Sequence, residues 1–169
     1  MKENETGDPS HPFRHREPIR GWPPSREGWP RGPWDNEPDR IEWEASGYPA
    51  LIVRNHTGAL CGYVGVPNGH PAYGKGYDEI PVYEVHGGLT YTDRCCGPIC
   101  HVPKPGESDD VWWVGFDCQH GMDDAPGLMR YEMRGPARHY PRLGTYKTVD
   151  YVRAEVEKLA LELRELESA

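Results

Sequence analysis

The sequence contains no apolar run long enough to cross a membrane, because about 20 consecutive apolar residues are needed to span the hydrocarbon core. Residues 1 to 10 are polar throughout, so we expect no secretory signal peptide. Positive charge is also scarce, since 19 Lys and Arg stand against 27 Asp and Glu and the net charge is −8. These absences predict a cytoplasmic protein and argue against both a membrane partner and a nucleic-acid partner.

Cysteine is sparse and odd in number, with five in the chain. In a cytoplasmic protein such cysteines are expected to be thiols or metal ligands rather than a disulfide framework. Cys95, Cys96, Cys100 and His101 lie in C-C-G-P-I-C-H, whose residue types suit a structural zinc site. The spacing lacks the paired C-x2-C knuckles of zinc ribbons, so partly buried thiols remain the alternative.

Glycine and proline are abundant, at 20 and 18 residues, whereas only 36% of the chain is hydrophobic. This composition predicts one α+β domain with a small, mostly antiparallel β-sheet, long loops and few helices. Thr148 is the expected N-cap of a C-terminal amphipathic helix, because apolar residues then recur every three or four positions. We expect strands at 48–54 and 59–66, joined by a turn at 55–58, and further strands at 80–91 and 111–116.

Residues 1–46 form a proline-rich arm that precedes the domain at 47–169. Proline disfavours helix interiors and sheet ladders, so the arm should be extended. Trp22, Trp29 and Trp34 recur in it beside arginines. Because burying such side chains is worth on the order of 2 kcal/mol each, we expect the arm to wrap over the core or over a partner subunit. Stacking of these tryptophans on nucleobases is the alternative.

The densest group of chemically active side chains follows the strand at 111–116, which should be buried on both faces. Asp117, His120, Asp123 and Asp124 come directly after it, where a strand passes into a glycine-containing turn. Each residue taken alone is explained by turn capping or by a satisfied buried histidine. Their density makes this strand end the first candidate for a functional site.

Two further histidines lie beside glycine or proline, His70 in P-N-G-H-P and His86 in V-H-G-G. With His120, and with Asp117 or Asp124, they are candidate ligands for one divalent metal ion, zinc or manganese. A metal site with an open position activates water near neutral pH, so hydrolysis is the expected chemistry. The general base would be a further carboxylate. The two candidates for it are Glu84 and Asp123.

Candidate ligand-binding residues occur in the sequence both before and after the expected strand at 111–116. Arg130 and Arg134 belong to a set of four arginines at four-residue intervals, and prolines and Gly135 predict a loop there rather than a helix. Such a loop could hold a phosphate or carboxylate, although solvated arginines are an equally good interpretation. In a protein that binds a ligand without turnover, four tyrosines are candidates for stacking on that ligand: Tyr73, Tyr77, Tyr83 and Tyr91.

Three segments, G-H-P-x-Y-G at 69–74, V-H-G-G-L-T-Y at 85–91 and W-W-x-G-F-D-C-x-H-x-x-D at 112–123, occur in this order, and a Y-V-x-x-E helix starts at Tyr151. This combination resembles a family of small uncharacterised proteins of bacteriophages and prophages. The resemblance runs from Ala59 to the C-terminus and brings no known activity with it. It implies a phage or prophage origin and therefore action in the cytoplasm of a bacterial host.

Together these patterns predict a metal-assisted hydrolase that acts on a small anionic substrate bearing phosphate or carboxylate. One alternative is a non-catalytic phage protein that binds a nucleotide-like ligand or a host bacterial protein. Another is a virion or assembly protein that forms a homo-oligomer through the N-terminal arm or the C-terminal helix. Metal content separates the first interpretation from the second.

Overall fold

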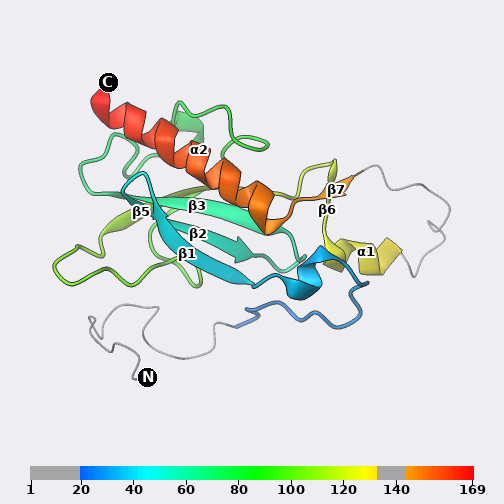
Figure 1. Ribbon diagram of the computed structural model, residues 1–169. Helices are drawn as coiled ribbons and strands as arrows, with labels where there is room; N and C mark the ends of the chain where they lie inside the picture. Colours follow the sequence, from blue (N-terminus) through cyan, green and yellow to red (C-terminus); the bar gives the residue numbers. More distant parts are fainter. Residues whose placement is uncertain (1–19, 133–143) are drawn as a thin grey trace.

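A computed structural model describes residues 20–132 and 144–169, which form an α+β fold (Figure 1). Five strands make one sheet in the order β1-β2-β3-β5-β4, and every neighbouring pair is antiparallel. This confirms the expected fold class. The strands of the sheet are β1 (Arg40–Ala45), β2 (Tyr48–Arg54), β3 (Leu60–Pro67), β4 (Tyr91–Asp93) and β5 (Val111–Asp117).

The remaining elements are short, apart from the C-terminal helix. Two strands, β6 (Asp123–Asp124) and β7 (Thr145–Tyr146), form a separate parallel pair. The helical elements are η1 (Pro33–Asn36), η2 (Tyr77–Glu79), α1 (Pro126–Glu132) and α2 (Val149–Ser168).

Helix α2 begins and packs as the sequence predicted. Thr148 is its N-cap, and the side chain of Thr148 accepts a hydrogen bond from the backbone N–H of Tyr151. The helix lies across one face of the sheet over β1, β2 and β3 (Figure 1). Its apolar stripe is buried there: Val152, Val156, Leu159, Ala160 and Leu163. In the part of the chain that the structure describes, no helix is long and apolar enough to cross a membrane.

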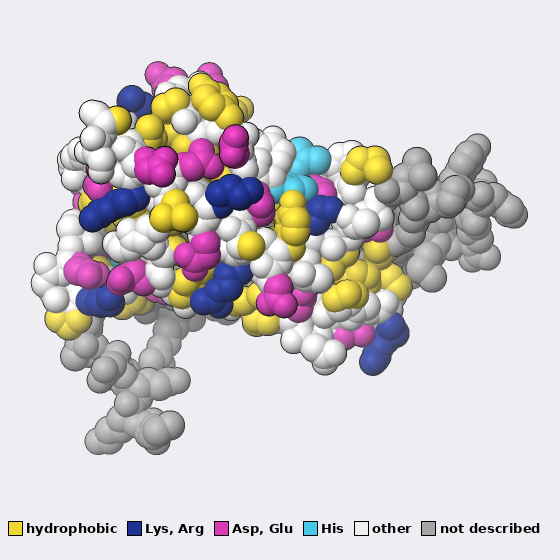
Figure 2. Space-filling view, turned by 45° about the horizontal axis from the view of Figure 1, so that its top comes forward, with side chains coloured by type: hydrophobic (Ala, Val, Ile, Leu, Met, Phe, Trp, Pro, Cys, Tyr) yellow, Lys and Arg dark blue, Asp and Glu magenta, His cyan; other side chains and the backbone are white. Residues whose placement is uncertain are grey.

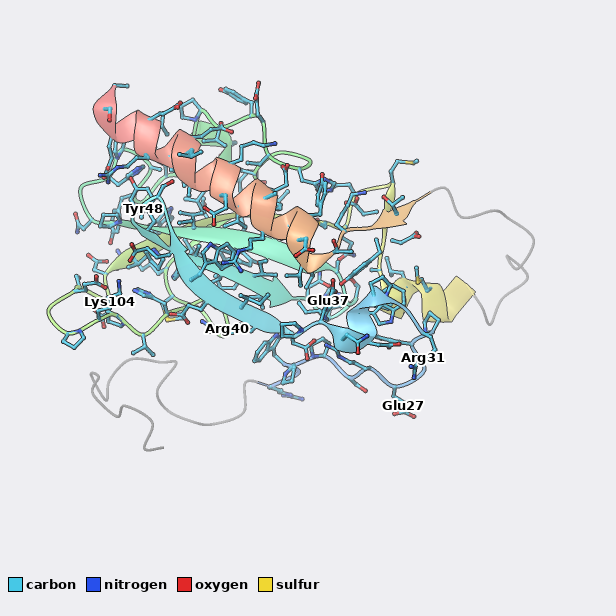
Figure 3. All side chains as sticks on the ribbon, viewed as in Figure 1. Glu27, Arg31, Glu37, Arg40, Tyr48 and Lys104 are labelled. Carbon is cyan, nitrogen blue, oxygen red and sulfur yellow. A yellow bond between two sulfur atoms is a disulfide. The ribbon has the colours of Figure 1, made fainter. Side chains whose placement is uncertain are left out.

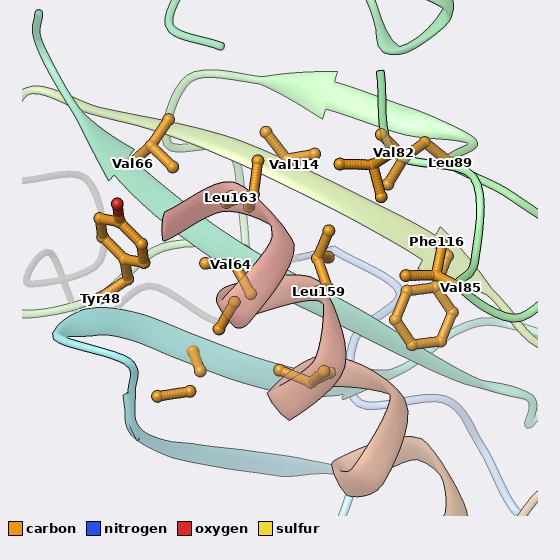
Figure 4. Packing of buried hydrophobic residues seen from close by; sticks show 14 of the residues in the cluster. Tyr48, Val64, Val66, Val82, Val85, Leu89, Val114, Phe116, Leu159 and Leu163 are labelled. Carbon is orange, nitrogen blue, oxygen red and sulfur yellow. The ribbon is translucent and has the colours of Figure 1, made fainter. Parts of the chain in front are cut away.

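The sheet is apolar on both faces, because alternate side chains of its central strands point to opposite sides. On the side of α2, Val64 of β3 and Val114 of β5 join the main core with Leu159 and Leu163 of the helix (Figure 4). On the other side a smaller cluster forms around Trp113, which is fully buried. This two-sided burial confirms the expectation for β5 and explains why its sequence is almost continuously apolar.

The β2–β3 hairpin forms where the sequence placed it. Asn55 and Gly58 close the turn, since the Gly58 N–H donates to the Asn55 carbonyl over 3.0 Å. Gly62 of β3 pairs without interruption with both neighbouring strands. A Cβ on Gly62 would lie only 2.4 Å from Cγ2 of Val156. This glycine therefore permits the close approach of α2 and marks no β-bulge.

The expected strand at 80–91 is wrong except at its C-terminal end. Backbone hydrogen bonds before residue 90 are local, from Val82 to Ile80 and from Gly88 to Val85. Pairing with β5 begins only at Thr90, whose N–H donates to the Gly115 carbonyl over 2.9 Å, and continues into β4. Pro81 has no N–H to offer to a ladder, and the paired glycines at 87 and 88 both have positive φ. The segment is irregular, and it still buries four apolar side chains in the main core: Ile80, Val82, Val85 and Leu89.

Two further elements differ from expectation. Strand β1 lies within the range assigned to the arm and forms the edge of the sheet beside β2. The segment expected as a loop after residue 125 begins with the short helix α1. Before β1, the described part of the arm, residues 20–39, lies over the core as expected. Trp34 is 4% exposed, and Nε1 of Trp22 donates to the carbonyl of Arg54 over 3.1 Å.

One arginine ties the arm to the rest of the fold. The Arg54 guanidinium is fully buried and pairs with carboxylates of the arm, Glu37 and Asp39. Glu37, labelled in Figure 3, also accepts the backbone N–H of Val149 over 2.9 Å and so holds the first turn of α2. Arm, hairpin and helix therefore meet at a single buried charge network.

A disulfide joins Cys95 and Cys100. The expectation of thiols or zinc ligands is therefore wrong for these two cysteines, because bonded sulfurs are not available as thiolate ligands. Cys96 is an exposed free thiol, and His101 is buried at 6% exposure. Burial raises the pKa of the Cys61 thiol to about 12, as expected for an inert core cysteine.

Candidate metal centre

Asp123 and His120 are brought together by the turn that follows β5. The Asp123 carboxylate accepts the backbone N–H of His120 over 2.9 Å, and the His120 carbonyl accepts the N–H of Asp123. Asp123 also belongs to β6, where it pairs with Thr145 of β7. The turn at His120 and the pairing with β7 thus both hold Asp123 in place, and its side chain is only 2% exposed.

His86 comes from a second turn, at 85–88. The Gly88 N–H donates to the Val85 carbonyl over 2.9 Å, and Gly87 at the third position has φ of +66°. A turn with positive φ at this position favours glycine, because other side chains clash with the backbone there. The ring of His120 lies against this glycine, since a Cβ on Gly87 would fall 2.1 Å from its Cε1. The V-H-G-G sequence therefore positions His86 in the turn, and its first glycine leaves space for the ring of His120.

Three side chains converge at this point: His86, His120 and Asp123. Their candidate ligand atoms all lie within 4.8 Å of one another, and no other such group of His, Cys, Asp or Glu occurs in residues 20–132 and 144–169. Asp123 Oδ2 lies 2.7 Å from Nε2 of His86 and 3.2 Å from Nδ1 of His120. Ligand atoms on one zinc ion lie up to about 4 Å apart, because each is about 2.1 Å from it. Small side-chain movements would therefore allow the three to share an ion.

The cluster is open on one side. The exposed fraction rises from 2% for the Asp123 side chain to 14% for His86 and 36% for His120. Figure 2 shows histidine side chains reaching the surface beside basic and acidic side chains. An ion held here would be accessible to water and to a small substrate.

The local electrostatics keep Asp123 ionised. Burial raises the pKa of its carboxyl, but hydrogen bonds from His86 and from the His120 backbone lower it more, so the net pKa is below the ordinary value of 3.8. The ammonium of Lys147 lies 3.5 Å from Oδ1 of Asp123. A charged carboxylate beside two imidazoles is a donor set that zinc, manganese and iron accept.

His70, another predicted ligand, is not part of this cluster. It is 4% exposed, and its Nδ1 accepts the N–H of Ala72 while Nε2 donates to the carbonyl of Leu163, both over 2.9 Å. Both ring nitrogens are thus used to fix a loop onto α2. His70 is therefore a buried histidine with both ring nitrogens hydrogen-bonded.

The two predicted aspartate ligands lie beside the cluster rather than in it. Oδ1 of Asp117 is 4.0 Å from Nδ1 of His120, and its Oδ2 accepts a hydrogen bond from Thr90 over 2.9 Å. Asp124 is half-buried and pairs with Tyr146 in the β6–β7 ladder. Asp117 is therefore a carboxylate at the edge of the site.

Glu84, a predicted general base, is exposed, and its backbone carbonyl accepts a hydrogen bond from Lys158. Of the predicted anion-binding residues, Arg130 lies in α1 with its side chain outside the described part, and Arg134 lies outside the described residues altogether. Asp123, the other predicted base, lies at the centre of the cluster.

The predicted stacking tyrosines do not converge. Tyr73 donates to Asp110, which directly precedes β5, whereas the histidines lie beyond the other end of that strand. The ring of Tyr91 packs edge-on against Tyr63 at 5.2 Å, on the face of the sheet opposite α2. Tyr77 and Tyr83 are 49% and 80% exposed. These positions give no support to a tyrosine-lined pocket for a nucleotide-like ligand.

Sequence reasoning missed the contribution of α2 and the residues just before it. The hydroxyl of Tyr151 lies 2.8 Å from Nδ1 of His86, and a carboxylate oxygen of Glu155 accepts the His86 backbone N–H over 2.7 Å. Lys147 lies beside both Asp123 and the Tyr151 ring. The Y-V-x-x-E pattern carried a usable signal, because residues four apart lie on one face of a helix.

No protein-family model, curated protein or solved structure matches this chain. The resemblance to phage and prophage proteins therefore stays a prediction.

Proposed function

We propose that this protein is a metal-assisted hydrolase that acts on a small substrate bearing a phosphate or a carboxylate. His86, His120 and Asp123 are the proposed ligands, and zinc or manganese is the proposed ion. The observation that carries the proposal is the convergence of these three side chains from two separate turns on one partly open point.

The donor set favours chemistry over a purely structural ion. Structural zinc sites are closed by four protein ligands, whereas catalytic sites use three and leave a position for water. Two imidazoles and one carboxylate supply three ligands here. A bound divalent ion lowers the pKa of its water to about 7 and polarises a substrate oxygen, which are the two requirements of hydrolysis at neutral pH.

The neighbouring charges assign further roles. Lys147 lies beside Asp123 and, among the described cations, is the one that we propose attracts an anionic substrate group. Asp117 is the carboxylate outside the ligand set that approaches His120 to 4.0 Å, so it is a better candidate for the proton acceptor than Glu84. The substrate class of this proposal thus rests on one lysine and not on the arginines that the sequence suggested.

A bacterial host cytoplasm remains the proposed location, and its assignment to a bacterial host depends on the phage resemblance alone. The Cys95–Cys100 disulfide argues against it, because disulfides are rare in reducing compartments. Thiols are labelled in the protein isolated from its source, with and without reductant. Two additional labelled thiols after reduction would show that the disulfide exists there and would argue against a reducing cytoplasm.

The first test of the function is elemental analysis of the purified, untagged protein. We expect one divalent ion per chain, or its uptake when zinc or manganese is added. His86→Ala should abolish this binding. His56→Ala is the matched control, because His56 is exposed and does not belong to the ligand cluster, and this variant should keep the ion.

A screen of phosphoesters and amides then follows with the loaded and the chelated protein. Turnover that disappears on chelation and in His86→Ala supports the proposal. A wild-type protein that contains no ion and takes up neither zinc nor manganese would refute it.

A further inference from the structure

Helix α2 holds His86 by two contacts that come from one face of the helix. Tyr151 contacts the ring nitrogen Nδ1 over 2.8 Å, and Glu155 accepts the backbone N–H over 2.7 Å. The two residues are four positions apart and therefore lie one above the other. The rings of Tyr151 and His86 also meet edge to face, with centroids 5.4 Å apart and an interplanar angle of 89°. The imidazole is thus fixed in both position and orientation.

The hydrogen bonds define where the proton of a neutral His86 lies in the metal-free protein. An ionised carboxylate only accepts hydrogen bonds, so Nε2 of His86, 2.7 Å from Asp123, carries the hydrogen. Nδ1 of the neutral ring is then an acceptor and takes the hydroxyl hydrogen of Tyr151. In this state Tyr151 is the donor.

Binding of a metal ion would reverse this arrangement. A metal ion needs the lone pair of Nε2, because that is the His86 nitrogen that faces Asp123. The ring hydrogen must then lie on Nδ1, and the only change required of Tyr151 is rotation of its hydroxyl so that the oxygen accepts. A hydroxyl can serve as donor or acceptor without moving its oxygen atom. The same contact therefore fits both states.

Resting on the proposed metal site, we infer that Tyr151 is the positioning residue of His86. With the ion bound, its hydroxyl accepts Nδ1–H and so stabilises and orients the tautomer that presents Nε2 to the ion. Outer partners of this kind orient ligating histidines and raise their basicity, and their loss costs about 10- to 100-fold in metal affinity. Tyr151 is 40% exposed, so its hydroxyl has little role in the core.

The test compares zinc affinities by calorimetry for the wild type, Tyr151→Phe and Tyr77→Phe. Phenylalanine keeps the ring and removes only the hydroxyl. We expect Tyr151→Phe to weaken zinc binding about 10- to 100-fold. Tyr77 has a similar exposure, 49%, and lies in η2, so Tyr77→Phe should leave the affinity unchanged. Far-UV circular dichroism and thermal unfolding check that all three proteins are folded.

A spectroscopic measurement separates positioning from simple loss of packing. In ¹⁵N spectra of the imidazole rings, zinc-loaded wild type should show His86 with hydrogen on Nδ1, and the metal-free protein with hydrogen on Nε2. In zinc-loaded Tyr151→Phe, the Nδ1–H of His86 loses its acceptor and should exchange faster with water. Unchanged exchange together with unchanged affinity in Tyr151→Phe would overturn this inference and leave the metal site standing. A wild type that binds no ion would overturn both.

Discussion

Two clusters of charged side chains near the start of α2 join distant parts of this chain, and they differ in how completely they are enclosed. Around Arg54, all five guanidinium N–H donors have protein partners: Asp39, Glu37, Tyr146 and the carbonyls of Pro38 and Gly58. Around Asp123, the ligand atoms bond mainly to one another and His120 remains 36% exposed.

The contrast shows which polar group holds the fold and which is available to a ligand. A guanidinium with every donor satisfied and no exposed surface has nothing left to offer a substrate. A carboxylate shared by two imidazoles at a partly open edge has its ligand atoms directed at one another, where an ion could replace those hydrogen bonds. We therefore assign stability to the Arg54 cluster and propose chemistry only for the candidate metal centre, and each prediction below tests that division.

Arg54→Leu should have the largest effect on stability. The change leaves the partly buried carboxylates of Glu37 and Asp39 without their main partner, and breaking a buried ion pair costs about 3–5 kcal/mol. Urea unfolding measures the loss. Arg31→Leu is the control, because its side chain is 96% exposed and such an ion pair contributes at most about 1 kcal/mol. Equal losses in the two variants would remove the distinction between the clusters.

Asp123→Asn should abolish metal binding and cost about 1–3 kcal/mol of stability at neutral pH, since the hydrogen bonds of a nearly buried carboxylate are disturbed. The stability cost should depend on pH with a defined sign. The folded-state pKa of Asp123 is below its ordinary value of 3.8, so its ionised form stabilises the native state. That contribution is complete above about pH 5 and is lost as pH falls through the folded pKa.

Urea unfolding from pH 7 down to about pH 3 measures this dependence. Wild type and Asp123→Asn should converge in stability toward the acid end. A gap that stays constant over the whole range would show that the carboxylate charge contributes nothing, and would contradict the hydrogen-bond pattern around His86.

Gly87→Ala and Gly88→Ala form a matched pair that distinguishes an effect on folding stability from an effect on zinc binding. Both glycines have positive φ, +66° and +80°, so alanine should cost about 1 kcal/mol or more at either position. Only at Gly87 would the new Cβ meet the His120 ring, at 2.1 Å, whereas nothing lies within 4 Å at Gly88. Zinc titration should show about tenfold weaker binding for Gly87→Ala alone, because a displaced ligand costs binding energy. Equal affinities would mean that His120 is not a ligand.

The sequence predicted the elements whose signals are local. Short apolar runs identified β2 and β5, and the three- and four-residue spacing identified α2 together with its cap at Thr148. The prediction for 80–91 failed because its spaced β-branched and aromatic residues imitate a strand. Pro81 and the glycine pair, which prevent ladder pairing, were the stronger signal. Strand β1 was missed because the proline-rich composition of the arm was extended too far along the chain.

The site was predicted by residue type but not by arrangement. His86, His120 and Asp123 were all selected, yet His70 looked equivalent to the other histidines in its local sequence. What separates them is a set of long-range contacts, from His70 to Leu163 of α2 and from His86 to Tyr151. Such contacts depend on where α2 crosses the sheet, and no short segment of sequence encodes that.

Glu84→Gln should have the smallest effect, and for that reason it tests the comparison most sharply. Glu84 precedes His86 by two residues, and a strand would have placed both side chains on one face. The segment is irregular instead, and the exposed Glu84 carboxylate lies outside the ligand group. The free energy of unfolding should therefore stay within about 0.5 kcal/mol of the wild type, because surface substitutions seldom exceed that value, and zinc affinity should stay within about twofold.

If turnover is found, it should survive in Glu84→Gln and fall in Asp117→Asn, since removing a general base costs about 10²- to 10⁴-fold in rate. The reverse order would move the catalytic carboxylate from the edge of the metal centre to the surface beside α2.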